Sequence, residues 1–249
     1  MALFEARHLS KRFGDRVVLE DISLEFEAGQ LSGIMGPNGA GKSTCFNVLT
    51  GHFPPDRGRV LLGGEDITGL SPRQIAKKGI ARSFQIISLF DEFTVLENVL
   101  FALPRVRAMG FNLFHDVAGD SKIIDQALAV VEQVGLTESA DVRSSQLSYG
   151  ERRALEIAVA LAAEPRILFL DEPTQGMGAN GRNRLLDLIL SLKRKYTIVM
   201  IEHDMDFLFS LADRISVIHW GQVIAQGTPG ELQGDPWVRR ANLGASPHA

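Results

Sequence analysis

The sequence has little cysteine and tryptophan and contains no long uninterrupted hydrophobic run. A single cysteine, Cys45, excludes an intramolecular disulfide, so we expect a reducing compartment and a small buried core residue here. No stretch approaches the ~18 uncharged apolar residues of a membrane-spanning helix. Glu5 and Arg7 interrupt the start of the chain, where a signal peptide would be apolar. We therefore expect a cytoplasmic protein that reaches a membrane only through another protein.

An excess of positive charge is also absent. The chain has 26 Lys and Arg against 30 Asp and Glu, which gives a net charge of -4. This balance leaves no basic footprint of the kind that nucleic-acid-binding surfaces need, so we expect no nucleic-acid partner. With 45% hydrophobic and 22% charged residues in 249, the composition is that of a globular protein with a substantial core.

Short apolar runs alternate with longer segments of helical periodicity, which is typical of an α/β fold with a largely parallel sheet. The clearest predicted strands are 30–35, 167–170, 196–201 and 214–219. The run 167–170 has no polar alternation, so it should be covered on both faces. Its end should therefore point into a site.

Other parts of the chain follow different patterns. The first ~30 residues and 58–68 alternate like antiparallel strands, with turns at 12–15 and at Gly63-Gly64. Between 96 and 163 the pattern is mostly helical, with its loop expected at 119–121. We predict one domain, in which 1–85 and 164–249 form the catalytic core with a β subdomain and 86–163 form an inserted, mainly helical subdomain.

Residues 36–43 match the phosphate-loop pattern G-x-x-x-x-G-K-[ST] between a predicted strand and a predicted helix. Glycines let successive backbone N–H groups turn toward phosphate oxygens, and the helix adds the positive end of its dipole. Lys42 supplies a charge for the β and γ phosphates, and the Ser43 hydroxyl can ligate Mg²⁺. A glycine-rich turn without a ligand is the alternative.

Two further motifs follow the phosphate loop. Asp171 and Glu172 come directly after the buried strand 167–170, at the sheet edge where ligands bind in such folds. Asp171 would hold Mg²⁺ through water, and Glu172 would polarise an attacking water; a polar loop is the alternative. Upstream, Ser148 and Glu151 form a capping-box pattern before an amphipathic helix, which could be purely structural.

In this order, the phosphate loop, the segment 147–151 and the acidic pair resemble the motifs of ATP-binding cassette (ABC) proteins. The resemblance implies an α/β, P-loop NTPase (RecA-like) core with an antiparallel β subdomain and an inserted α-helical subdomain, using ATP and Mg²⁺. It implies catalytic roles for Glu172, His203 and Lys42, and metal contacts for Ser43, Gln85 and Asp171. The implied nucleotide contacts are Phe13, Gly36, Asn38, Gly39, Gly41, Lys42, Ser43, Thr44, Gln85, Ser148, Gly150 and Glu151.

Three of these roles depend on the resemblance alone. Phe13 matches the aromatic that stacks on adenine, although a buried strand aromatic is the alternative. Gln85 matches the glutamine that reaches Mg²⁺ and reports the nucleotide state to a membrane partner, and His203 matches the histidine that contacts the γ phosphate. In this family the signature of one subunit closes over the phosphate loop of a second, so we expect a homodimer or a heterodimer with a paralogue.

The sequence departs from the family pattern at two positions. Tyr149 replaces the usual first glycine of the signature pair, which is tolerable if its side chain points away from the nucleotide. Gly178 stands where a carboxylate or amide often follows the acidic motif. It leaves the loop 175–180 without one expected polar contact across the dimer.

Residues 79–85, 89–99, 101–114 and 241–244 resemble the ATPase subunits of importers for branched-chain amino acids and related solutes such as amides or urea. The resemblance implies two integral membrane permease subunits, a solute-binding protein and a location on the inner face of the cell membrane. A permease helix would dock in a groove lined by Ile86, Ile87, Leu89, Phe90 and Phe93, although these residues could instead fill the helical subdomain.

Two other functions remain open at this point. A soluble cassette ATPase of DNA maintenance or translation should have heptad arms, a second cassette or a basic face, none of which is found. A GTPase or small-molecule kinase would lack the signature helix, and no Asn-Lys-x-Asp guanine motif is present.

Overall fold

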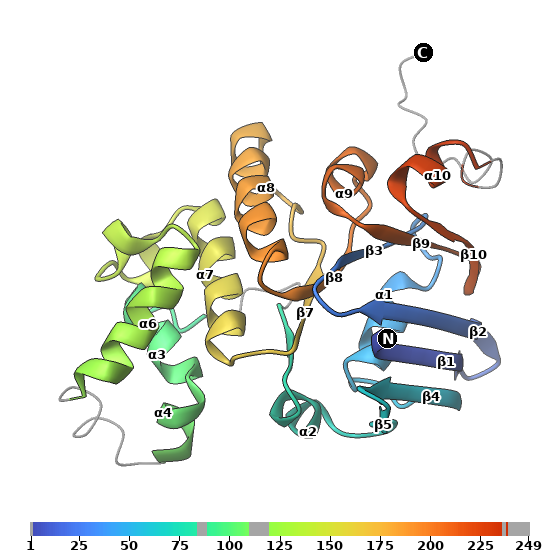
Figure 1. Ribbon diagram of the computed structural model, residues 1–249, viewed down its shortest axis with the longest axis horizontal. Helices are drawn as coiled ribbons and strands as arrows, with labels where there is room; N and C mark the ends of the chain where they lie inside the picture. The colour runs from blue at the N-terminus through green and yellow to red at the C-terminus, as the bar shows by residue number, and fades with distance from the viewer. Residues whose placement is uncertain (1, 84–88, 110–119, 236–237, 239–249) are drawn as a thin grey trace.

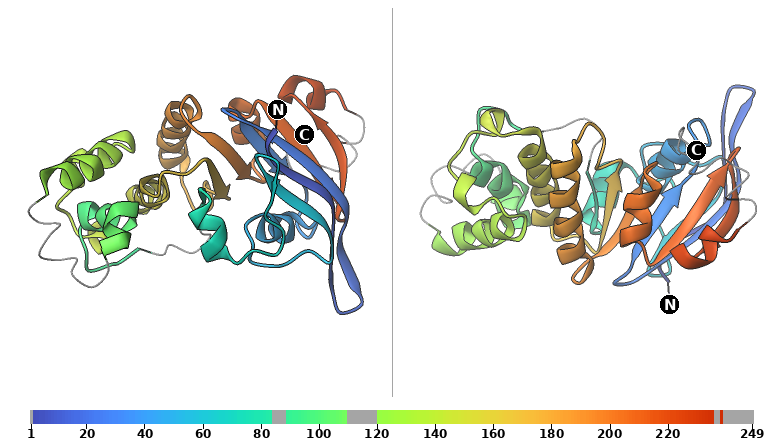
Figure 2. Two further views of the ribbon diagram at one scale, coloured as in Figure 1. Left: turned by 60° about the horizontal axis from the view of Figure 1, so that its bottom comes forward. Right: turned by 90° about the horizontal axis from the view of Figure 1, so that it is seen from above.

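The computed structural model describes residues 2–83, 89–109, 120–235 and 238. Its strands form two sheets at one end of an elongated molecule, and a group of helices forms the other end (Figure 1). Figure 2 shows the same division from two further directions. The α/β class predicted from the sequence is confirmed.

A four-stranded antiparallel sheet is built from the segments predicted to alternate. Its strands are β1 (Ala2–Phe13), β2 (Arg16–Glu27), β4 (Arg57–Leu62) and β5 (Glu65–Asp66), in the order β2-β1-β4-β5. Gly14, with a φ of 58°, makes the tight turn between β1 and β2, as glycine does without steric cost. Both predicted turns lie where expected.

A six-stranded sheet forms the centre of the molecule, in the order β10-β9-β3-β8-β7-β6, with β10 antiparallel and the others parallel. The strands are β3 (Leu31–Met35), β6 (Ile80–Arg82), β7 (Ile167–Asp171), β8 (Thr197–Ile201), β9 (Arg214–His219) and β10 (Gln222–Gly227). The four predicted strands are confirmed to within one residue. The short β6 and the partly exposed β10 were not predicted.

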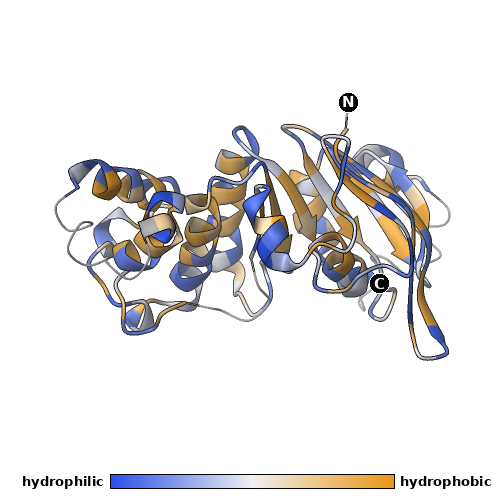
Figure 3. Ribbon diagram, turned by 90° about the horizontal axis from the view of Figure 1, so that it is seen from below, coloured by the Kyte–Doolittle hydropathy of each residue, from blue (hydrophilic) through white to orange (hydrophobic). Residues whose placement is uncertain are grey.

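Strand β7 is covered on both faces, as its apolar run indicates. Ile167 and Phe169 pack into the core shared with the antiparallel sheet, and Leu168 and Leu170 pack into the core on the helical side. Successive side chains of a strand point to opposite faces, so one buried strand joins the two cores. In Figure 3 the strands of the central sheet carry largely hydrophobic colouring, which also marks parts of the helices.

The helices follow the strands in the pattern expected of parallel crossovers. They are α1 (Lys42–Leu49), α2 (Pro72–Lys77), α3 (Val95–Ala102), α4 (Pro104–Met109), α6 (Ser121–Gln133), α7 (Tyr149–Ala162), α8 (Ala179–Lys193), α9 (Met205–Leu211) and α10 (Pro229–Gln233). Helices α3, α6 and α7 pack against one another. No described helix has both the length and the apolar composition needed to cross a bilayer.

The described residues between 96 and 163 are helices and connections without a strand. Of the predicted loop at 119–121, Gly119 lies outside the described residues, Asp120 caps α6 and Ser121 begins it. The division at 85/86 and 163/164 stays a prediction.

Candidate functional site

The phosphate loop connects the end of β3 to the start of α1, between two close neighbours. A Cβ atom on Gly36 would lie 2.0 Å from the carbonyl oxygen of Ile218, which no side chain could tolerate. At Gly41, where φ is 103°, a Cβ atom would lie 2.9 Å from the carbonyl oxygen of Val18. These positions require glycine because the loop is pressed between β9 and β2. The turn is a fixed cradle rather than a loose glycine-rich linker.

Lys42 holds the loop from within. Its Nζ donates hydrogen bonds to the carbonyl oxygens of Gly36 at 2.8 Å and Pro37 at 3.0 Å. Burial lowers the pKa of Lys42, while the nearby carboxylates of Glu172 and Asp171 raise it. The lysine is therefore close to the predicted catalytic carboxylate of Glu172 and the predicted metal-binding carboxylate of Asp171. An anion in the cradle would meet a poorly solvated cation.

Helix α1 presents Ser43 and Thr44 toward the open side and buries the residues that follow. Ser43 is exposed and Thr44 is half-buried, while Cys45 and Phe46 are fully buried. Burial raises the pKa of Cys45 to about 12, so this thiol is an inert core group, as predicted. The helix thus turns its polar first residues to the cradle and its apolar residues to the core.

Asp171 is the last residue of β7 and is only 2% exposed. Its Oδ2 accepts a hydrogen bond from Nη2 of Arg82 at 2.8 Å. A buried carboxylate needs such a partner to stay charged. The sequence analysis did not identify Arg82, because it is 89 positions from Asp171 and ends a strand of only three residues.

Glu172 adopts a backbone conformation that is rare for a residue with a side chain, with φ at 43°. Its N–H donates to the carbonyl oxygen of Ile201 on β8, which fixes the bend. One carboxylate oxygen of Glu172 lies 3.8 Å from Nδ1 of His203. Such outliers persist where the surrounding structure enforces them, and they concentrate at functional sites. The fold thus brings two predicted catalytic residues together from neighbouring strands.

Two buried charged residues that the sequence analysis missed hold this bend in place. Glu202 is fully buried, and its Oε1 accepts from the N–H of Thr174 at 2.9 Å and from its hydroxyl at 2.7 Å. Arg153 on α7 donates to the backbone carbonyl oxygens of Asp171 at 2.8 Å and Glu172 at 3.1 Å. No local sequence pattern predicts the contacts of Glu202 and Arg153, because each joins segments at least 18 residues apart.

Ser148 and Glu151 form the predicted capping box at the start of α7. The Ser148 hydroxyl and N–H both donate to Oε2 of Glu151, at 2.6 and 2.9 Å. These bonds lower the pKa of Glu151. Tyr149 donates its phenol to the carbonyl oxygen of Gln175 at 2.7 Å and so is directed to the loop after the acidic motif.

The two halves of the predicted site lie apart in this single chain. Helices α1 and α7 are separated along the long axis of the molecule in Figures 1 and 2. A pocket beside the start of α7 is lined by Ser148, Gly150 and Glu151, and its lining includes no residue of 36–43. Gly178 caps α8 without a side-chain hydrogen bond, so the expected polar group is absent.

Phe13 is 45% exposed at the end of β1, so the alternative of a buried strand aromatic is wrong. Its ring packs edge-on against Phe53, with centroids 5.3 Å apart. Lys11 lies 5.6 Å from the ring centroid. The Phe13 ring is therefore partly exposed, and the adenine contact stays a prediction.

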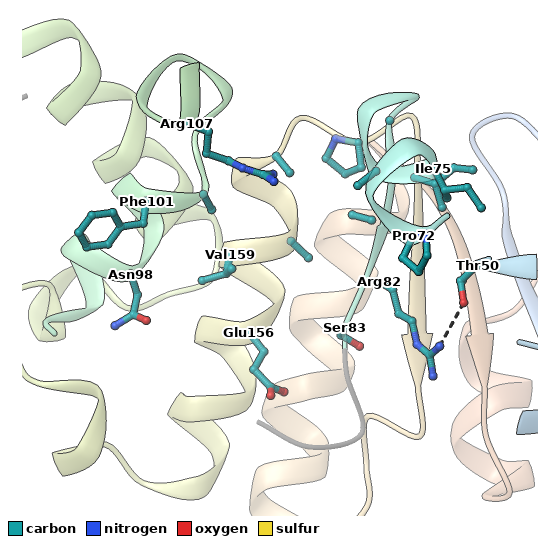
Figure 4. A pocket seen from close by; sticks show the side chains of 18 of the residues that line it. Thr50, Pro72, Ile75, Arg82, Ser83, Asn98, Phe101, Arg107, Glu156 and Val159 are labelled. Atoms are coloured by element: carbon teal, nitrogen blue, oxygen red, sulfur yellow. Dashed lines mark hydrogen bonds between the residues drawn. The ribbon is translucent and has the colours of Figure 1, made fainter. Parts of the chain in front are cut away.

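A cavity of about 340 Å³ opens between β6 and the helices (Figure 4). Of the predicted groove residues, Leu89 and Phe90 line it, and Phe93 instead packs on Phe90 with centroids 5.4 Å apart. Gln85, Ile86 and Ile87 lie outside the described residues. The buried Asn98 holds the segment by donating to the carbonyl oxygens of Phe90 and Phe93.

The donor set suits a magnesium ion bound together with a phosphate. Asp171 offers a carboxylate and Ser43 an exposed hydroxyl, and oxygen ligands of this type are those that Mg²⁺ prefers. Within the described residues no cluster of three His, Cys, Asp or Glu side chains could hold a metal alone. Phosphate oxygens and water would have to complete the coordination.

Comparison with known proteins agrees with this geometry. Residues 19–175 match the family model described as ABC transporter. The chain is 38% identical to the high-affinity branched-chain amino acid transport ATP-binding protein LivG of Escherichia coli (strain K12), over 97% of this chain and 98% of that protein. It is 39% identical to BraF of Pseudomonas aeruginosa, with the same coverage and the same described role.

Solved structures give the same result. The structure described as the ADP conformation of MJ1267, an ATP-binding cassette of an ABC transporter, superposes with a TM-score of 0.86 at 30% identity. It covers 98% of this chain and 99% of that chain. A nucleotide-free ATP-binding cassette from an ABC transporter superposes with a TM-score of 0.84, also at 30% identity, covering 98% and 100% of the two chains.

Proposed function

The chain belongs to the ABC transporter family, and from this premise we propose that it binds and hydrolyses ATP to energise a membrane importer. The observation that carries the proposal is the position of Lys42. It lies in a glycine cradle beside the Asp171 and Glu172 carboxylates, which is the arrangement that a polyphosphate and its metal require.

Each residue has a distinct task in this reaction. The amides at the start of α1 and the Lys42 ammonium bind the phosphates, and Ser43 and Asp171 would hold Mg²⁺, which neutralises the charge that develops on them. Glu172, whose backbone bends at the end of β7, orients and polarises the attacking water. His203, 3.8 Å from Glu172, contacts the γ phosphate.

The reaction needs a second cassette. Ser148 and Gly150 lie at the start of α7, away from the phosphate loop of the same chain. A helix N-terminus from another subunit would supply donors to the γ phosphate from the opposite side. We propose that ATP closes the pair and that loss of the γ phosphate loosens it. The partner is a second copy or a paralogue.

The names of the relatives support a proposal for the solute and the membrane partners. LivG and BraF are described as branched-chain amino acid transport proteins, and the proposed solutes are branched-chain amino acids or related small polar molecules. Two permease subunits at the inner face of the cell membrane would dock on the pair of cassettes, and each would place a short helix in the cavity beside Phe90 of one cassette. Phe90 is 57% exposed there. A binding protein would deliver the solute.

Co-purification from native membranes tests the proposal. The chain should recover two integral membrane proteins, and Phe90→Arg should lose them while the variant still binds ATP. Leu190→Arg is a matched control, because Leu190 is an exposed apolar residue on α8 that does not line the cavity. Recovery of no membrane protein would instead favour a soluble ABC ATPase that acts outside transport.

A further inference from the structure

Arg82 forms a largely buried ion pair with the carboxylate of Asp171. The Arg82 side chain is 12% exposed and the Asp171 side chain 3%, and Nη2 lies 2.8 Å from Oδ2. The other carboxylate oxygen, Oδ1, accepts no hydrogen bond from the described part of the chain. The arginine therefore fixes one oxygen of Asp171 and leaves the second for another ligand.

The same guanidinium reaches the helix that follows the phosphate loop. Nη1 donates to Oδ1 of Asn47 on α1 at 2.6 Å and to the Thr50 hydroxyl at 3.1 Å. Its carbon Cζ lies 4.7 Å from the centroid of the Phe46 ring. The planar fork of an arginine presents its donors in a fixed geometry, whereas the ammonium of a lysine is a compact point charge on a flexible stem. One side chain thus ties the end of β7 to α1.

Arg82 also forms part of the cavity wall. It lines the cavity together with Thr50 and Ser83, and Figure 4 shows its hydrogen bond to Thr50. A displacement of this wall would therefore move a group in direct contact with Asp171.

We infer that Arg82 is a positioning residue for the magnesium site: it orients the Asp171 carboxylate against α1 and links that carboxylate to the wall of the cavity. The inference rests on the proposed nucleotide site. Arg82 itself touches neither nucleotide nor metal in this account.

Electrostatics distinguishes positioning from simple charge balance. A cation beside a metal ligand repels Mg²⁺, so removal of the charge alone would strengthen magnesium binding. Loss of orientation would weaken it, because supporting groups around a metal ligand typically contribute 10-fold to 100-fold in affinity. The two roles therefore predict changes of opposite sign.

The test measures binding of a fluorescent ATP analogue across a Mg²⁺ titration and again in EDTA, with melting temperatures as the check on folding. Arg82→Gln should raise the Mg²⁺ concentration for half-maximal binding about tenfold, and Asn47→Ala should raise it about threefold. Binding in EDTA should change less than about twofold. Arg59→Gln, which removes an exposed partner of Asp66, should change nothing.

An unchanged or lower Mg²⁺ requirement in Arg82→Gln would overturn the inference, as would an equal loss of binding in EDTA. If Arg82→Gln does not fold, the Mg²⁺ requirement of Asn47→Ala tests the inference, and an unchanged or lower requirement would overturn it. Failure of the unaltered chain to bind ATP would instead overturn the proposed function.

Discussion

The phosphate-loop side and the signature side of this molecule satisfy their polar groups in different ways. Near the phosphate loop, the carboxylates of Asp171 and Glu202 are almost fully buried, and each has a distant partner, Arg82 at 89 positions and Thr174 at 28 positions. At the signature, Ser148 and Glu151 satisfy each other across one helical turn, and Tyr149 stays 46% exposed. On the phosphate-loop side, distant parts of the same chain satisfy the buried polar groups. On the signature side, the start of α7 remains accessible to a partner subunit.

The largest effect should come from Glu172→Gln. Because the variant keeps the cradle but loses the general base, ATP binding should persist while turnover falls ~10²-fold to 10⁴-fold. Phosphate release and nucleotide affinity measure the two separately, and Mg-ATP should trap the variant with its partner cassette. Glu138→Gln, at an exposed position, is the control. Rapid hydrolysis by Glu172→Gln would remove this residue from its assigned role.

Phe169→Ala should destabilise the phosphate-loop side by about 3–5 kcal/mol, because it leaves a cavity in a fully buried core. The Phe169 ring makes edge contacts with Phe4 and Phe46, each with centroids 5.3 Å apart, so its loss would also loosen α1. Denaturant unfolding gives the free energy of unfolding. A loss below about 1 kcal/mol would mean that this core is not packed as described.

On the signature side, a single hydrogen bond can be removed with little other change. Tyr149→Phe keeps the ring and loses the bond to the Gln175 carbonyl oxygen, at a cost of about 0.5–1.5 kcal/mol. The same unfolding measurement applies. A cost as large as that of Phe169→Ala would contradict the contrast between the two sides.

The smallest effect concerns pH. Burial, and then the charge of Arg82, lower the pKa of His52 below its ordinary 6.5, although its hydrogen bond with Thr50 opposes this. The unfolded chain therefore takes up a proton first, so the stability contributed by neutral His52 is present above pH 6.5 and is lost as pH falls from there through the folded pKa. His52→Asn should therefore reduce the slope of the free energy of unfolding against pH in the range below pH 6.5, which denaturant unfolding at several pH values measures. An unchanged slope would contradict the assignment.

Local patterns predicted the parts of the fold that local chemistry determines. The apolar run before Asp171, the glycines of the phosphate loop and the capping box at Ser148 all appear where expected. These features depend on residues close together in the chain.

The parts that were missed depend on distant contacts. β6 is three residues long and is recognisable only through its pairing with β7. Arg82, Arg153 and Glu202 are charged residues that a sequence reading places on the surface, yet each has a partner distant in the chain and a side chain that is largely buried. The role of Gln85 and the boundaries between the subdomains stay predictions.

The central claim is that one chain contains a complete phosphate-binding half-site and presents its other half to a partner. Calorimetric titration of the isolated chain with Mg-ATP tests it most directly, using Lys42→Ala and Gly150→Glu. A Cβ atom at Gly150 meets nothing within 4 Å, so the second variant should fold normally. We expect Lys42→Ala to weaken ATP binding about 10-fold to 100-fold and Gly150→Glu to change it less than about twofold, although both variants abolish turnover. Equal losses of affinity, or a larger loss in Gly150→Glu, would contradict it.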